Sequence, residues 1–541
     1  MTTIDPHVAG SGAAVSGERA DGFLATVADW VTSTDHKKIG RLFIGFSLLL
    51  LLGVAVVAVL LGVERIDATE DMLDAGALPQ LFSLYRVVLT FGVVVPFGLG
   101  LAIAVTPLQL GARALAFPRL AATGFWAWLF GTGLAIGAIC ANGGPGGGDA
   151  DMVQLFLVSL ALAVVGLIAA AGSVAASVLT TRAPGMNMRR VPLFSWSALV
   201  YALGLVLALP VLVGVLVLLY LDHNYGRTVF GGNKGIGEWL HVSMSQPATV
   251  LYSIPAFGLL LDAAATATRS RLKLRGIGLL GLGLLGTALF AGVAQVDANL
   301  SRNLVDLQGS DAAREIVPFL VINGLPLLGG AVVFLVLLAN LVRKPRVQSP
   351  LLFGFFGAGM AFVGLVANAV YHVGDAQVLG TVFEEGAWVY VSYGTVLALL
   401  GGVVYWGPKL WGRSIPDKQV LPLALLGVLA TILASLPLLI AGFADQPADA
   451  TLFSYSGPQE LWNTLAAVGH GLMALTVLGF VALALRSFTS GEHAGDDPWD
   501  GQTLEWATSS PAPADNFAEV HVISSAEPLL DLKPARTEGA A

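Results

Sequence analysis

A succession of twelve apolar runs, each long enough to cross a lipid bilayer, constrains this chain more than any other feature. A membrane-spanning helix needs about 20 predominantly apolar residues, and 55% of the 541 residues are apolar whereas only 12% are charged. Polar loops separate the runs, so the pattern predicts an all-α, polytopic membrane protein. The predicted spans cover residues 41–63, 81–108, 119–141, 152–180, 192–221, 238–261, 276–296, 316–342, 350–371, 378–407, 420–442 and 460–486.

Three segments follow from this pattern. Residues 1–28 are polar and rich in Gly and Ala, which predicts a disordered segment without a cleavable signal peptide. Residues 29–488 form the twelve-helix membrane domain, and residues 489–541 form a tail. Fifteen Lys and Arg residues lie in the loops on one side and five on the other. The positive-inside rule therefore places the basic loops and both termini in the cytoplasm of a plasma-membrane protein.

The stretch from Leu81 to Trp126 carries a specific pattern. A span with a central Pro96 leads into PLQLGA at 107–112 and then into AFPRL at 116–120 and Phe-Trp at 125–126. This stretch closely resembles the second membrane helix and following loop of subunit I of the haem–copper terminal oxidases, the cytochrome c oxidase core.

Four further segments carry the same resemblance in the same order. They are WVTSTDHKKIG at 30–40, RAPGM at 182–186, YWGPKLWGR at 405–413 and DPWDGQTLEWATSSPAPADNF at 497–517. The resemblance covers about residues 28–530. It implies twelve membrane helices, a place in the aerobic respiratory chain, and a family site that holds two haems and copper.

The resemblance also locates the family's ligand positions in this sequence. Tyr85 stands where a haem-ligating histidine is expected, at the family's spacing of 22 residues before Pro107. In the sixth helix, Gln246, Ala248 and Val250 replace the copper histidine, the proton-relay glutamate and the cross-linked tyrosine.

The remaining ligand positions lie in the seventh and tenth helices. Gln295 and Val296 stand nearest to the expected pair of copper histidines, and Gly386 and Trp388 replace the two haem histidines of helix ten. All six expected histidines are therefore absent. The loop aspartate that opens a proton path in the family is Ala114 here.

Coordination chemistry gives these substitutions a consequence. Copper needs imidazole or sulfur donors, and haem iron is held by His, Cys, Met or Tyr. Tyr85 is the one candidate axial ligand that is left, and we expect it to be a packing residue instead. The sequence thus predicts a degenerate subunit I paralogue, a pseudoenzyme that binds neither haem nor copper.

Two structural expectations follow from the loss of the ligands. A large void would be costly, so we expect the rings of Tyr85 and Trp388 to approach each other in the vacated space. A lone charge within the membrane is also costly. We therefore expect Arg86 to pair with Glu384 or Glu385, the alternative being that its side chain extends to the interface.

The remaining histidines do not form a metal-binding pattern. His223, His241, His372 and His470 are not spaced as ligands on one helix, so we expect solvated or hydrogen-bonded side chains. His470 lies inside the twelfth span, where an ionisable side chain is expected to face a partner.

Three functions are compatible with these observations. The first is a catalytically silent structural or accessory subunit of a membrane respiratory complex, with the lipid bilayer and other membrane subunits as partners and no nucleic acid. The second is an active terminal oxidase that couples cytochrome c oxidation to oxygen reduction and proton pumping. The third is a transporter or channel that reuses the interior, with Arg86, Asp297, Glu384 and His470 as lining residues.

Overall fold

The computed structural model describes residues 22, 28–67, 72–74, 76–227, 229, 235–244, 248–295, 298–301, 309–448, 458–517, 519 and 522–532. Most of the predicted disordered segment lies outside these residues. The chain divides into a short unit, Met1–Ser33, and a large unit, Thr34–Ala541. In the short unit, residues 28–31 are helical.

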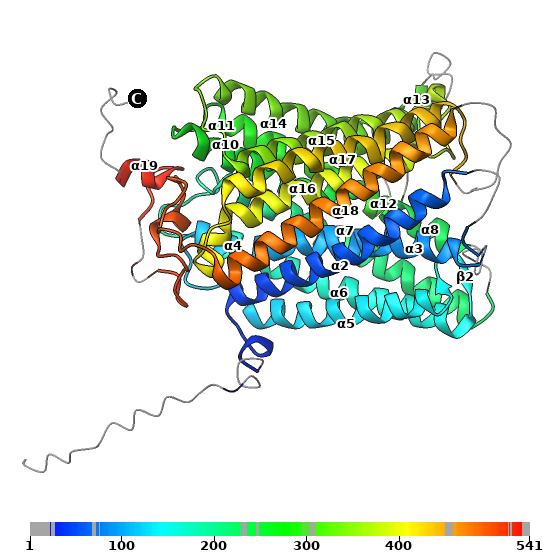
Figure 1. The fold of residues 1–541 in the computed structure, drawn as a ribbon, viewed down its shortest axis with the longest axis horizontal. Helices are drawn as coiled ribbons and strands as arrows, with labels where there is room; N and C mark the ends of the chain where they lie inside the picture. The colour runs from blue at the N-terminus through cyan, green and yellow to red at the C-terminus, as the bar shows by residue number, and fades with distance from the viewer. Residues whose placement is uncertain are drawn as a thin grey trace, which may run out of the picture. The chain divides into compact units, whose positions relative to one another are not determined.

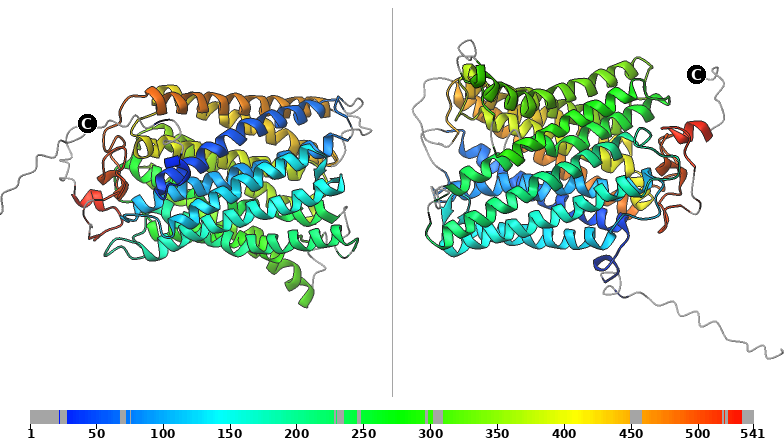
Figure 2. Two further views of the ribbon diagram at one scale, coloured as in Figure 1. Left: turned by 90° about the horizontal axis from the view of Figure 1, so that it is seen from below. Right: turned by 180° about the vertical axis from the view of Figure 1, so that it is seen from behind.

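The large unit is a helical bundle, and the predicted count of twelve membrane spans is confirmed within the described residues. Figures 1 and 2 show the long helices running side by side. The spans are α2 (His36–Glu64), α3–η1–α4 (Leu78–Val87, Val88–Val94, Val95–Gln109), α5 (Pro118–Cys140), α6 (Ala150–Thr180), α7 (Leu193–Asn224), α9–α10 (Thr249–Tyr252, Ile254–Thr268), α11–η3–α12 (Arg275–Leu285, Gly286–Ala288, Leu289–Ala294), α13–η4–α14 (Gly309–Phe319, Leu320–Gly324, Leu325–Leu341), α15 (Ser349–Tyr371), α16 (Phe383–Trp411), α17 (Asp417–Phe443) and α18 (Gln459–Ser490).

Several short elements lie outside the spans. They are the antiparallel ribbon of β1 (Gly143–Gly144) and β2 (Gly147–Gly148), the helices α8 (Gly235–Met244) and α19 (Pro528–Leu532), and the 3₁₀ turns η5 (Gly374–Ala376) and η6 (Leu504–Ala507).

Three of the twelve spans form the interior of the bundle. The most apolar 18-residue windows of Leu78–Gln109, Thr249–Thr268 and Phe383–Trp411 are entirely buried, whereas at most 56% of the residues in any other span's window are buried. The other nine spans therefore surround these three and present apolar side chains to the surface, as expected for helices that face lipid.

Two of the spans contain a π-helical segment immediately before a proline. Val95 donates its N–H to the carbonyl of Thr90, five residues earlier, and Pro96 follows; Leu325 bonds Leu320 in the same way before Pro326. A proline ring clashes with the preceding helical turn and lacks an N–H. The wider turn accommodates that clash without ending the helix.

The tenth span begins later than predicted. Residues 378–382 were expected to be helical, but α16 starts at Phe383. Gly380 has a φ of +77°, a left-handed conformation that interrupts a helix. The Thr381 hydroxyl then accepts the N–H of Phe383. The sixth span was predicted from residue 238; its spanning helix begins at Thr249, and α8 is a separate element.

The C-terminal segment packs against one end of the bundle, which we call the tail end. The indole of Trp499 donates to the carbonyl of Tyr405 at 2.9 Å. The N–H of Ala512 donates to the carbonyl of Lys409 at 3.0 Å. The side-chain amide of Asn516 donates to the carbonyl of Ala112 at 2.8 Å. Figure 1 shows this segment beside the start of α2. The opposite end of the bundle, where α2 ends and α3 begins, is called the cleft end.

Candidate functional site

Two aromatic rings meet at the centre of the cleft-end half. Tyr85 of α3 and Trp388 of α16 have ring centroids 5.1 Å apart and planes at 90°. Their exposed fractions are 1% and 0%. This edge-to-face contact is a favourable aromatic geometry. The structure thus brings together the two positions expected to share the vacated space.

A hydrogen-bonded chain continues from this contact. Tyr85 donates its hydroxyl to that of Tyr393 at 3.4 Å, and the Tyr393 hydroxyl lies 2.8 Å from Nδ1 of His470. The chain joins α3, α16 and α18, three helices distant in sequence. Sequence reasoning missed Tyr393. The signal was the intramembrane His470, which needed a hydrogen-bonding partner.

Arg86 forms an ion pair with Glu384. Its two terminal nitrogens donate to the two carboxylate oxygens at 3.0 and 2.6 Å, a bidentate arrangement that is strong and directional. The guanidinium also lies 4.8 Å from the centroid of the Trp388 ring. The structure therefore shows pairing with the first of the two expected carboxylates.

Glu385 has a different partner. Arg65, the residue that caps the C-terminus of α2, donates to its carboxylate at 2.6 Å, and the side chains are 8% and 9% exposed. The guanidinium also lies 4.5 Å from the centroid of the Phe82 ring. Sequence reasoning counted Arg65 only as a loop residue. The signal was the tandem of carboxylates, since two buried negative charges need two cations.

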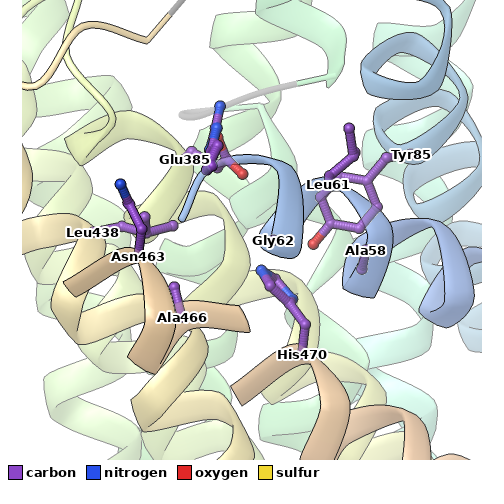
Figure 3. Close-up of a pocket in the computed structure, with 10 residues that line it drawn as sticks. Ala58, Leu61, Gly62, Tyr85, Glu385, Leu438, Asn463, Ala466 and His470 are labelled. Carbon is purple, nitrogen blue, oxygen red and sulfur yellow. The ribbon is translucent and has the colours of Figure 1, made fainter. Parts of the chain in front are cut away.

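Two cavities adjoin these ion pairs. A small cavity of about 10 Å³ is lined by Arg65, Tyr85, Glu385, Asn463 and His470 together with apolar side chains. Figure 3 shows Tyr85, Glu385, Asn463 and His470 around one space. A larger cleft of about 510 Å³ opens at the cleft end, and its described lining includes Arg65, Arg86, Glu384 and Glu385.

The other predicted positions lie elsewhere. A Cβ added at Gly386 would be 3.0 Å from the carbonyl oxygen of Ser435 on α17, so the glycine allows α16 and α17 to pack closely. Ala248 and Val250 are buried apolar residues, and Ala114 is exposed in a loop. Gln295 donates its side-chain amide to the carbonyl of Gly292. Gln246, Val296 and Asp297 lie outside the described residues.

The described residues that resemblance matches to the family's ligand positions have side chains of a different chemistry. Trp388 offers an N–H donor and no lone pair for iron, and its ring touches that of Tyr85. Of the three positions matched to copper ligands, only Gln295 lies within the described residues, and it carries a neutral amide instead of the imidazole or sulfur donor that copper needs. Within the described ranges, no group of three or more His, Cys, Asp or Glu residues could hold a metal ion.

A second buried polar cluster lies at the tail end. The side-chain amide of Gln109 donates to the carboxylates of Asp262 and Glu505, at 2.9 and 3.0 Å. Asp262 accepts the N–H groups of Leu193 and Phe194 at the start of α7. Burial raises the pKa of the Glu505 carboxyl to about 7; the hydrogen bond from Gln109 opposes this shift and the charge of Asp262 adds to it. The cluster joins the C-terminal segment to three spans.

These features define a polytopic helical membrane protein with a buried three-helix centre. Residues 38–493 match the family described as Cytochrome C and Quinol oxidase polypeptide I. The chain belongs to this family.

Curated relatives agree with the family assignment over most of the chain. The putative cytochrome c oxidase subunit 1-beta of Streptomyces avermitilis is 28% identical, with 94% of this chain and 92% of that protein covered. Cytochrome c oxidase subunit 1 of Bacillus subtilis is 27% identical, with 93% and 82% covered. Quinol oxidase subunit 1 of Bacillus subtilis is 24% identical, with 94% and 81% covered.

A solved structure of a haem–copper terminal oxidase dimer has a related fold. It superposes with a TM-score of 0.67 over 85% of each chain, at 14% identity. The bundle is therefore the haem–copper oxidase fold, and the chain is a multi-pass membrane protein.

Proposed function

We propose that this chain is a catalytically silent member of its family that serves as a structural or accessory subunit of a membrane respiratory complex. Its place is the plasma membrane, with both termini in the cytoplasm. The relatives, which are cytochrome c and quinol oxidase subunits of bacteria, support the respiratory setting. Its partners are the bilayer and other membrane subunits of that complex.

The contact between Tyr85 and Trp388 carries this proposal. Resemblance assigns these positions to the two histidines that face each other across one haem. Here their rings touch at a centroid distance of 5.1 Å, which leaves no space for a porphyrin between them. Arg86 covers the Trp388 ring and Tyr393 bonds the Tyr85 hydroxyl, so side chains of the protein itself occupy the surroundings of both rings.

Absorption spectroscopy of the purified full-length chain tests whether the chain is catalytically silent. We expect no Soret band in reduced-minus-oxidised spectra and no stoichiometric copper by elemental analysis. Stoichiometric haem and copper, together with oxygen uptake on a reduced donor, would support the active terminal oxidase instead. Purification from native membranes tests the role: the proposal requires respiratory membrane subunits to co-purify.

A second candidate function, transport, is favoured by the cleft of about 510 Å³, which reaches Arg86 and Glu384 inside the bundle. Liposomes that contain the purified chain distinguish the two candidates. Solute flux that depends on the chain, and that is abolished by Glu384→Gln, would support transport, whereas an inactive chain that co-purifies with oxidase subunits supports the accessory role.

A further inference from the structure

The small cavity has the size and lining of a site for one water molecule. Its volume of about 10 Å³ is close to the minimum of about 10–15 Å³ that a buried water requires, and such a water needs two to four polar partners. Three helices and the residue that follows α2 supply polar groups, from Arg65, Tyr85, Glu385, Asn463 and His470. An apolar cavity of this size would stay dry, and this one is polar.

The orientation of the His470 ring determines which of its nitrogens faces the cavity. Nδ1 of His470 lies 2.8 Å from the Tyr393 hydroxyl, so one ring nitrogen is engaged within the bundle. Figure 3 shows the imidazole pointing into the space bounded by Asn463, Glu385 and Tyr85. A molecule in the cavity is thus positioned to hydrogen-bond the second ring nitrogen, Nε2.

One ion pair lines both this cavity and the cleft. Arg65 and Glu385 line the small cavity, and both also line the cleft of about 510 Å³. Their side chains are joined at 2.6 Å. Because both residues line both spaces, a rearrangement of this pair would join the cavity to the cleft. From His470 the hydrogen-bonded chain runs through Tyr393 to Tyr85, which itself lines the cavity.

We propose that the cavity is an internal water-binding site, in which one water molecule bridges Nε2 of His470 to the Glu385 carboxylate or the Asn463 amide. This water exchanges with the cleft through the Arg65–Glu385 pair, and through it the His470 imidazole exchanges its protons with the cleft end. The inference goes beyond the accessory role and does not depend on assembly with other subunits.

Nuclear magnetic resonance of the ¹⁵N-histidine-labelled full chain in nanodiscs tests this site, with water as the probe. We expect magnetisation transfer from water to Nε2 of His470, assigned by its loss in His470→Gln. Ala466 lines the cavity, so Ala466→Val fills it and abolishes the transfer while the Nδ1 signal bonded to Tyr393 persists. Ala482 is exposed on the same helix, and Ala482→Val is the matched control that leaves the transfer unchanged.

A second variant keeps the test decisive if Ala466→Val does not fold. Ala58 of α2 also lines the cavity, and we expect Ala58→Val to fill it and abolish the transfer in the same way. Absence of transfer in the wild-type chain, or transfer unchanged in folded Ala466→Val, overturns the proposal. Transfer unchanged in folded Ala58→Val would overturn the proposal as well. A haem band in the absorption spectrum would refute catalytic silence, whereas the water site is tested by the magnetisation transfer. Failure of the proposed function and failure of the water site are therefore distinguishable.

Discussion

The two ends of α16 belong to one buried helix but differ in how their residues are partnered. At the cleft end, Glu384, Glu385 and Trp388 contact residues of α2 and α3 through ion pairs and ring contacts. At the tail end, the retained motif contacts the C-terminal segment and α7: the rings of Trp406 and Phe194 are 4.5 Å apart, and Trp499 bonds the carbonyl of Tyr405.

The difference shows what the fold itself requires. Burying a polar group is costly unless it is hydrogen-bonded or paired, and both ends meet this demand. The tail end meets it with loop motifs of the family that pack on one another. The cleft end, where resemblance places cofactor ligands, pairs its buried charges through ion pairs between helices. The tail-end motifs thus pack against other parts of the chain, and Tyr85 and Trp388, which resemblance matches to haem ligands, contact each other.

The largest expected effect on stability follows from breaking the ion pair at the cleft end. Glu385→Ala leaves the Arg65 charge buried without its carboxylate, and we expect a loss of roughly 3–5 kcal/mol in the free energy of unfolding. SDS-induced unfolding in mixed micelles measures it. Glu460→Ala, at an exposed position in the first turn of α18, is the control and should cost at most about 1 kcal/mol. Equal losses in the two variants would refute the structural role of the pair.

The tail end is expected to respond to pH. The pKa of Glu505 is about 7 in the folded chain against an ordinary value of 4.5, so the folded state binds this proton more tightly than the unfolded chain. Stability therefore falls as pH rises through the interval from about 4.5 to 7, by about 2–3 kcal/mol between pH 5 and pH 8. Unfolding of the wild type and of Glu505→Gln at both pH values measures it. The variant should lose this dependence; an unchanged dependence would contradict the assignment to Glu505.

The smallest effect concerns the backbone of α16. Gly386→Ala places a methyl group 3.0 Å from Ser435 O and from Leu439 Cδ2, and such overpacking costs about 1–3 kcal/mol. Gly471→Ala on α18 meets nothing within 4 Å and should be neutral or slightly stabilising, because alanine is the better helix former. A loss of stability in both variants would show that close packing of α16 on α17 is not the cause.

Several parts of the site could be predicted from the sequence. Tyr85 and Trp388 could be paired because the motifs around Pro107 and Pro408 place them in register with a known architecture. The partner of Arg86 was narrowed to two adjacent carboxylates by the cost of an unpaired charge. Arg65 and Tyr393 were not found, because their partners lie 320 and 77 residues away and no local pattern connects them.

The sequence by itself determined the number of membrane spans, the family and the chemical identity of the residues at the ligand positions, because apolar run length and motif order are local properties of the chain. Tertiary structure alone decided that Glu384 pairs with Arg86 and Glu385 with Arg65, that Gly386 packs against α17, and that a small polar cavity adjoins His470. These outcomes depend on the distances between helices that are remote in sequence, and those distances are set by packing of the whole bundle.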